Sequence, residues 1–176
     1  MTSYLNAGRT GMISVILAHL RANPRAALVG FGSGSPDWDG APPPLVPRDT
    51  TALTAPFAYV VPFGIDYALL SSEVDHPAPA PITVNAIDYD LVTTPSPLIL
   101  VRARLPGGFA TDDDRVVREI GLSLFPGFAG GVGATQSRFL PGEVADVGRM
   151  ALIRRHAPVA HDGSNSGIDA FFLLEI

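Results

Sequence analysis

The stretch Val116-Val-Arg-Glu-Ile-Gly-Leu-Ser-Leu-Phe125 is the clearest strand signal in this sequence. Its even positions are mostly apolar, and a two-residue alternation is typical of a strand with one face in a core. A second alternating run, Leu98–Leu105, lies upstream across a Gly/Asp-rich connection. We therefore predict an antiparallel hairpin of these two runs that sets Val101 opposite Ile120 and Arg102 opposite Glu119.

Arg118 lies on the otherwise apolar face of this predicted hairpin. A guanidinium among apolar side chains needs hydrogen-bond partners. We expect Arg118 to reach a carboxylate or free backbone carbonyls, such as those of the proline-rich segment described below.

The remaining signals indicate one helix and several more strands. Apolar residues recur at helical spacing over Thr10–Ala22, where an amphipathic helix is predicted. Ile82–Leu91 alternates and then changes face, which suggests one strand with a bulge. Glycine, proline and polar residues predict a loop from Pro126 to Gly167, interrupted by a short strand or turn at Val147–Arg155. Further strands are expected at Ala26–Phe31, Phe57–Phe63, Ile65–Leu70 and Ile168–Ile176.

We therefore expect a mainly β (α+β) fold: a compact antiparallel β domain with one N-terminal amphipathic helix and extended Pro/Gly-rich arms. The length of 176 residues suits one domain, or one domain with an appendage. The predicted division is an N-terminal segment with the helix (1–25), a β-rich attachment domain (26–125), and a long loop excursion with a C-terminal strand (126–176).

The second informative stretch is Phe31-Gly-Ser-Gly-Ser-Pro-Asp-Trp38-Asp-Gly-Ala-Pro-Pro-Pro44, which closes with Thr50-Thr-Ala-Leu53. Its prolines exclude a helix or a central strand, so Asp37–Pro47 should be an extended surface segment. The proline spacing fits either a rigid linker or a left-handed extended helix that docks in an aromatic groove. Trp38, the only tryptophan, is either a core residue or the centre of an interface.

Together the two stretches resemble the tail-collar and baseplate-fibre attachment proteins of tailed bacteriophages. In those proteins a "GxG…W(D)…P…T-AL" entry precedes an "I-R-E-(I/V)-G-L" strand. The resemblance covers roughly Phe31–Phe125, in separated pieces, and implies a compact β-rich domain that holds a fibre or fibre adaptor on the baseplate. The matching positions, which are structural or docking positions, are Gly32, Gly34, Trp38, Pro42, Thr51, Ala52, Leu53, Arg118, Glu119, Ile120 and Gly121.

The function implied by this resemblance is that of a structural virion protein of a tailed, contractile bacteriophage. It would act through protein–protein docking as a baseplate or tail-fibre attachment (adaptor) component. Its partners would be other tail, baseplate and fibre proteins, and it would be present in several copies. It would be synthesised in the host cytoplasm and reside in the virion tail. A neck or tail-completion protein is one alternative, and a small hydrolase or metal-dependent enzyme is an alternative of another class.

Composition argues against several other classes. The net charge of −5 disfavours nucleic-acid binding, which needs a clustered positive surface. Without cysteine, disulfides and thiolate metal sites are excluded. No apolar run approaches a membrane span of about 20 residues, and no secretory signal is evident. We expect neither nucleic acid nor membrane as a partner. All 12 basic residues are arginine, which fits codon bias or planar multi-donor contacts at interfaces.

Residue patterns for catalysis are incomplete. Gly32-Ser-Gly34 lacks the third glycine and the helix of a dinucleotide loop. His156 and His161 lack a third metal ligand, and His76 lacks a nucleophile beside it. Asp112-Asp-Asp114 lacks the ligand spacing of a calcium loop. We predict no catalytic, cofactor or metal site, and hence no enzyme.

Docking surfaces are the remaining candidates. Charged residues make up 16% of the chain, against roughly 25% in an average soluble domain. The C-terminal strand is apolar on both faces and needs cover on both, so we expect self-association or burial of extended segments in partners. The interface candidates are Trp38, Pro42, Pro43, Pro44, Arg118, Phe171, Phe172 and Leu173.

Overall fold

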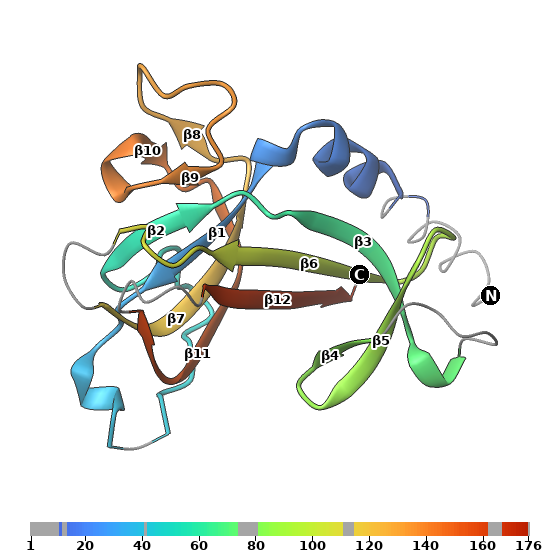
Figure 1. The fold of residues 1–176 in the computed structure, drawn as a ribbon, viewed down its shortest axis with the longest axis horizontal. Coiled ribbons are helices and arrows are strands. Elements are labelled where there is room, and N and C mark those ends of the chain that lie inside the picture. Colours follow the sequence, from blue (N-terminus) through green and yellow to red (C-terminus); the bar gives the residue numbers. More distant parts are fainter. Residues whose placement is uncertain are drawn as a thin grey trace. The chain divides into compact units, whose positions relative to one another are not determined.

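The computed structural model describes residues 11, 14–40, 42–73, 81–110, 115–161 and 167–175. The fold is mainly β with a helix near the N-terminus, as predicted (Figure 1). The helix includes residues 14–22, and none of the described helices is long and apolar enough to cross a membrane. The strands are β1 (Ala27–Gly32), β2 (Pro56–Val60), β3 (Gly64–Leu70), β4 (Ile82–Val84), β5 (Ile87–Val92), β6 (Leu98–Leu105), β7 (Arg115–Leu124), β8 (Gly127–Phe128), β9 (Arg138–Phe139), β10 (Val144–Asp146), β11 (Arg149–His161) and β12 (Ile168–Glu175).

The chain forms two compact units. The first unit comprises the described residues within Met1–Asn23, Phe63–Arg102 and Phe171–Ile176. The second unit comprises those within Pro24–Pro62 and Ala103–Ala170. The division at residues 25 and 125 that the sequence suggests stays a prediction.

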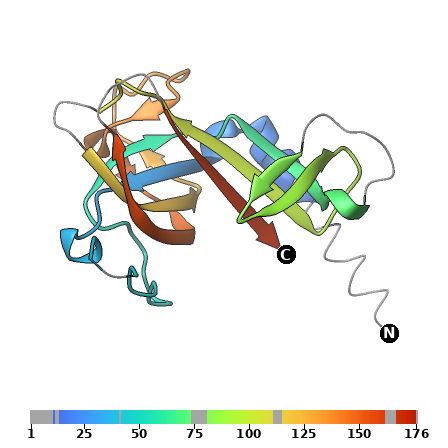
Figure 2. The same cartoon turned by 60° about the horizontal axis from the view of Figure 1, so that its bottom comes forward.

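The second unit is built on a five-stranded sheet with the order β11-β7-β1-β2-β9. Its pairings are antiparallel, and β1 and β7 run side by side at its centre (Figure 2). All six residues of β1 and residues 117–123 of β7 are buried. A strand covered on both faces does not need to alternate, and this explains the unbroken apolar and glycine run Ala-Leu-Val-Gly-Phe-Gly in β1.

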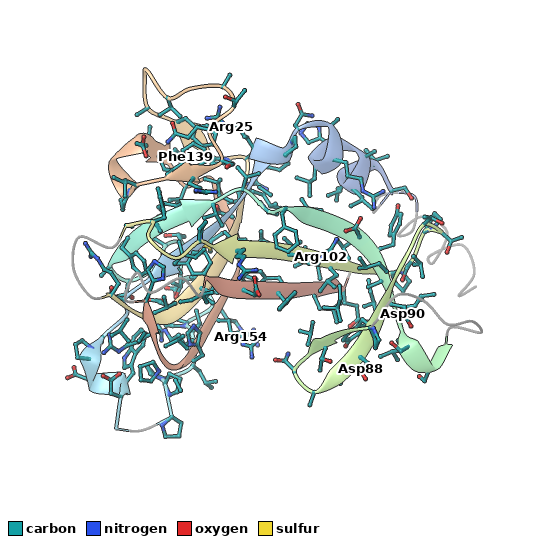
Figure 3. The ribbon with its side chains drawn as sticks, in the orientation of Figure 1. Arg25, Asp88, Asp90, Arg102, Phe139 and Arg154 are labelled. Atoms are coloured by element: carbon teal, nitrogen blue, oxygen red, sulfur yellow. The ribbon has the colours of Figure 1, made fainter. Side chains whose placement is uncertain are left out.

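A two-stranded sheet of β8 and β10 belongs to the same unit. Beside it, Leu28, Tyr59 and Phe139 form a buried cluster, with Phe128 packed against it. The guanidinium of Arg25 lies 4.0 Å from the centroid of the Phe128 ring and 5.3 Å from that of Phe139 (Figure 3). Arg25 therefore closes one side of this aromatic cluster.

In the first unit, β3 pairs antiparallel with β5 and β6, within a sheet of order β12-β6-β3-β5-β4. Its buried cluster comprises Ala68, Val84, Tyr89 and Leu100. On the helix, Leu17 and Leu20 are buried, in agreement with the predicted amphipathic pattern. The predicted first residue of that helix, Thr10, lies outside the described residues.

The predicted hairpin of Leu98–Leu105 with Val116–Phe125 is wrong. β6 pairs with β3, whereas β7 pairs with β1 on one edge and β11 on the other. The Arg102 guanidinium therefore lies 2.8 Å from the Asp66 carboxylate and not opposite Glu119. Alternation reveals which face a strand buries, but it does not reveal which strand lies beside it.

The predicted bulged strand over Ile82–Leu91 is also wrong, because β4 and β5 form a hairpin there. Its two turn residues, Asn85 and Ala86, have φ angles of 53° and 64°. Positive φ at both central positions is typical of the type I′ turn that matches the twist of paired strands. The turn was not predicted from the sequence because its second position is alanine, where glycine is the usual residue.

Within its described residues, the loop predicted from Pro126 to Gly167 contains four strands, and β11 alone has 13 residues. Two register shifts in its pairing with β7, between Met150 and Leu152 and between Arg155 and Val159, break the alternation. β11 is an edge strand, and an edge strand tolerates Pro158. The predicted short element at Val147–Arg155 is the first half of this longer strand.

Candidate functional site

The two sequence stretches that carry the resemblance meet in the second unit. Gly30 of β1 lies directly opposite Gly121 of β7. Leu53, only 6% exposed, packs over this pair. A Cβ atom on Gly121 would lie 2.9 Å from Cδ2 of Leu53, and one on Gly30 would lie 2.8 Å from its Cδ1. The glycines therefore leave the space that Leu53 fills, which explains why the two stretches occur together.

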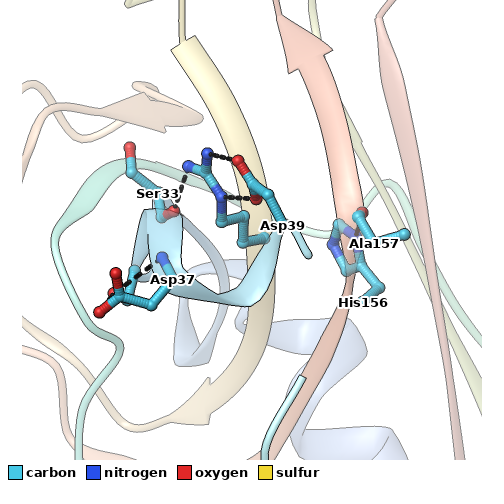
Figure 4. Close-up of polar contacts among 7 residues, drawn as sticks. Ser33, Asp37, Asp39, His156 and Ala157 are labelled. Carbon is cyan, nitrogen blue, oxygen red and sulfur yellow. Dashed lines mark hydrogen bonds and ion pairs between the residues drawn. The ribbon is translucent and has the colours of Figure 1, made fainter. Parts of the chain in front are cut away.

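Arg118 of β7 joins the stretches a second time. Its Nε and Nη2 donate to the two carboxylate oxygens of Asp39, each at 2.6 Å, and its Nη1 donates to the Ser33 carbonyl at 2.9 Å (Figure 4). Arg118 is only 8% exposed, so this fork is held in place by its surroundings. The expectation that Arg118 reaches a carboxylate and a carbonyl is confirmed, although the carbonyl precedes the proline run.

The charge of Arg118 also changes the acidity of its partner. Hydrogen bonding from Arg118 holds the pKa of the Asp39 carboxyl below its ordinary value of 3.8, and the Coulombic attraction acts in the same direction. Asp39 is thus ionised over the physiological pH range and stays paired with Arg118.

Glu119, next to Arg118, makes a third connection. It is fully buried, and its Oε1 accepts a hydrogen bond from the Thr54 amide at 2.7 Å. Its Oε2 lies 3.9 Å from Nε of Arg155, which is opposite Glu119 on β11. This distance is too long for a hydrogen bond, and both atoms are buried without a hydrogen-bond partner, so Arg155 acts on Glu119 only as a nearby cation.

Arg155 in turn holds the proline run. Its Nη1 donates to the Pro44 and Leu45 carbonyls, both at 3.2 Å. Its guanidinium lies 4.5 Å from the centroid of the Trp38 ring. A single planar group therefore stacks on an aromatic ring and binds two successive carbonyls, which a lysine ammonium could not do in this geometry.

Trp38 packs back onto the turn that precedes it. Gly34 has φ of +58°, and a Cβ atom there would lie 2.5 Å from the Trp38 ring and 2.9 Å from Cβ of Arg118. Both the positive φ and the contact with the ring require glycine at this position. Trp38 itself is half-buried, so it is partly a packing residue of its own chain.

We call residues 35–40 and 42–50 the arm. The arm follows β1, begins with the 3-10 helix Pro36–Trp38 and is otherwise irregular; it projects to the side of the sheet in both views, in light blue to cyan (Figures 1 and 2). Pro42 and Pro44 are exposed, and Pro43 is half-buried. Leu45 is 94% exposed and is the most exposed large apolar side chain of the described residues.

Three residues of this site were not singled out by the sequence. Asp39 and Arg155 fix the arm, and Leu45 forms its apolar tip. Leu45 could have been found from the sequence. It is an apolar residue between prolines, and no alternating strand pattern there predicts that its side chain is buried. The role of Arg155 carried no sequence signal, since it depends on a strand that was predicted only in part.

The C-terminal candidates lie in the first unit. Phe172 is 3% exposed and is already covered by its own chain. Phe171 and Leu173 are half-buried and pack against the cluster of Ala68, Val84, Tyr89 and Leu100. Their role in an interface stays a prediction.

Two histidines of the second unit have structural contacts. His161 is buried, with its Nε2 2.9 Å from the Phe109 carbonyl and its ring stacked on Phe57. The His156 Nδ1 hydrogen-bonds the Ala157 carbonyl at 2.6 Å (Figure 4). Within the described residues, no group of three or more His, Asp or Glu side chains could hold a metal ion. His76 and Asp112–Asp114 lie outside the described residues.

Comparison with known families gives one match, which spans nearly the whole chain. Residues 14–172 match the family described as "Baseplate wedge 3 tail fiber network component". No curated protein matches the sequence. The chain belongs to this family and is a structural component of a bacteriophage baseplate in the virion tail, as the sequence resemblance implied.

Proposed function

We propose that this baseplate component is an attachment adaptor, which docks through its arm onto a neighbouring tail or fibre protein, in several copies per particle. One observation carries the proposal. Apart from the 3-10 helix Pro36–Trp38 the arm is irregular, yet the buried Arg118 and the largely buried Arg155, on two neighbouring strands, hold it in one arrangement.

Such an arrangement is typical of recognition segments. Binding residues are often found on irregular segments that a rigid scaffold positions. A segment ordered before binding also loses less conformational entropy when its partner arrives. The family is described as a tail fibre network component, which supports tail and fibre proteins as neighbours of this chain.

A photoreactive amino acid at Arg48 tests the proposal, because Arg48 is an exposed residue of the arm. The matched control carries the same group at Arg138, an exposed residue of β9. Since the chain lacks lysine, amine-reactive cross-linkers are unsuitable. After irradiation of purified particles, mass spectrometry should find the position-48 variant joined to a baseplate or fibre protein, and the position-138 variant not.

Two results would contradict the proposal. One is absence of the chain from purified particles, and the other is cross-linking from position 48 to neck proteins. We also propose that the chain has no catalytic role, which the structural character of its family supports. Particles that carry H76A and H156A together should then assemble and infect like the wild type.

A further inference from the structure

We propose that Leu45 is the anchor of the arm: its side chain inserts into an apolar socket on a different protein of the baseplate, and Arg155 positions it. This inference rests on the proposed docking function and specifies which side chain is recognised and what kind of surface receives it.

The exposure of Leu45 is the first step. An isobutyl group that is 94% exposed gains nothing from its own chain. Burying a leucine contributes about 1.5–3 kcal/mol, so a partner that covers it gains most of that amount. Isolated exposed apolar residues are common, and exposure alone does not make an anchor.

The fixed backbone around Leu45 is the second step. The carbonyls of Pro44 and Leu45 both accept from Arg155, while the neighbouring prolines have fixed φ angles. The guanidinium of Arg155 lies on the Trp38 ring, and its Nε is 3.9 Å from Oε2 of the buried Glu119. The tip of the arm is therefore preorganised, and little conformational entropy remains to be lost at Leu45 on binding.

These contacts also indicate the mode of recognition. A free proline-rich ligand presents a fully solvated backbone to its receptor. In this arm two successive carbonyls already bind the protein's own Arg155, so that part of the backbone turns toward the sheet. The partner must then recognise the Leu45 side chain and not the backbone of an extended proline helix.

The size of the contact argues for another protein rather than a second copy. Stable dimers use roughly 20–30 residues a side, and the tip of the arm offers only Leu45 and its immediate neighbours. One small anchor is sufficient in an assembly where other protein–protein contacts also contribute to the binding free energy. Membership in a tail fibre network family points to such a multi-protein setting.

The test uses particles assembled without this chain, to which the purified protein is added back. The concentration that half-saturates these particles is measured for the wild type, L45N, L45M and L140N. Leu140 is 46% exposed in the same unit but outside the arm, so L140N is the matched control. We expect L45N to raise the half-saturating concentration about 10- to 100-fold, which corresponds to about 1.5–3 kcal/mol. L45M, which conserves volume and apolar character, should behave like the wild type, and so should L140N.

A separate variant tests the positioning role of Arg155. R155K keeps a cation beside Glu119 but cannot stack on Trp38 and bridge both carbonyls. It should fold, weaken binding, and red-shift the emission of Trp38, the only tryptophan. L45N should weaken binding without a change in this emission.

The outcomes separate the two proposals. If the wild type binds the particles and L45N binds them equally well, Leu45 is not the anchor, but the docking function remains. Wild-type protein that does not bind the particles contradicts the docking function itself. If light scattering shows a wild-type oligomer that L45N dissociates, the socket lies on a second copy and our choice of partner is wrong. Unchanged Trp38 emission and binding in R155K overturns the positioning role.

Discussion

Two segments of the second unit are each held by an arginine that binds two successive backbone carbonyls, and they differ in the side chain exposed at that position. In the arm, Nη1 of Arg155 binds two successive carbonyls while its guanidinium lies on Trp38. In the loop of residues 129–137, Nη1 of Arg25 binds the carbonyls of Gly133 and Ala134, both at 3.0 Å, while its guanidinium lies on Phe128. We call these two arrangements the arginine clamps.

The difference lies in the residues at the clamped position. The loop carries glycine and alanine there, so its clamp covers the aromatic cluster and presents no large side chain. The arm carries Leu45, which stands in solvent. The same clamp can therefore close a core or display a side chain, and the neighbouring sequence decides which.

The clamps also differ in what supports the arginine. Arg155 lies opposite the buried Glu119, whereas Arg25 has no carboxylate within 4.0 Å in the described part of the chain. Loss of Arg155 leaves the buried Glu119 without a nearby cation, whereas loss of Arg25 removes a ring contact and two hydrogen bonds to carbonyls. This contrast makes the comparison testable.

The largest expected effect is that of R155A, which should lower the free energy of unfolding by about 3–5 kcal/mol. The physical reason is that the Glu119 carboxylate stays buried without its cation. Urea unfolding followed by circular dichroism measures the loss. If the double variant R155A/E119Q were no more stable than R155A, the stranded charge would not be the cause.

G34A should come second, with a loss of about 2–4 kcal/mol. Alanine pays for the positive φ and also collides with the Trp38 ring. The matched variant in the loop is G130A, where a Cβ atom would meet nothing within 4 Å. Thermal unfolding should show G130A close to the wild type; equal losses in both variants would show that the arm is no more constrained than the loop.

R25A should cost less, about 1–2 kcal/mol, because it removes a cation–π contact and carbonyl hydrogen bonds without stranding a charge. The loop of residues 129–137 should exchange its amide hydrogens faster, while the emission of Trp38 stays unchanged. A loss as large as that of R155A would remove the distinction between the two clamps.

The smallest effect is expected on acidification. The pKa of Asp39 is lowered in the folded state, so its pairing with Arg118 stabilises the protein fully above pH 3.8 and is lost as the pH falls through the lower folded value. Trp38 emission should therefore change only below pH 3.8, and added salt should move the change toward higher pH.

A carboxylate near the loop offers the control for this titration. The pKa of Glu143 is also below its ordinary 4.5, first because of the hydrogen bond from Gln136 and then because of the Leu140 amide. Both donors are neutral, so salt should affect Glu143 little, and E143Q should leave the Trp38 titration unchanged. A Trp38 titration that E143Q abolishes would show that the arm does not respond to Asp39.

By itself the sequence determined several of the strands and the residues of the motif shared with baseplate proteins, whereas the strands after Pro126 were predicted mostly as loop. Alternation located β6 and β7, and the prolines predicted an extended segment, which the arm is except for the 3-10 helix Pro36–Trp38. The need of Arg118 for a carboxylate followed from its place in an apolar strand.

Only the tertiary structure decided which strands pair and which distant residues the buried charged side chains contact. The pairing of β7 with β1 and β11, rather than with β6, depends on strands 90 residues away along the chain or hidden by register shifts. That pairing places Arg155 opposite Glu119 and beside the arm, and so leaves Leu45 in solvent. The physical reason is that alternation and propensity are properties of neighbouring residues, whereas buried charges and clamped carbonyls are satisfied by whichever distant groups the packed sheet brings within reach.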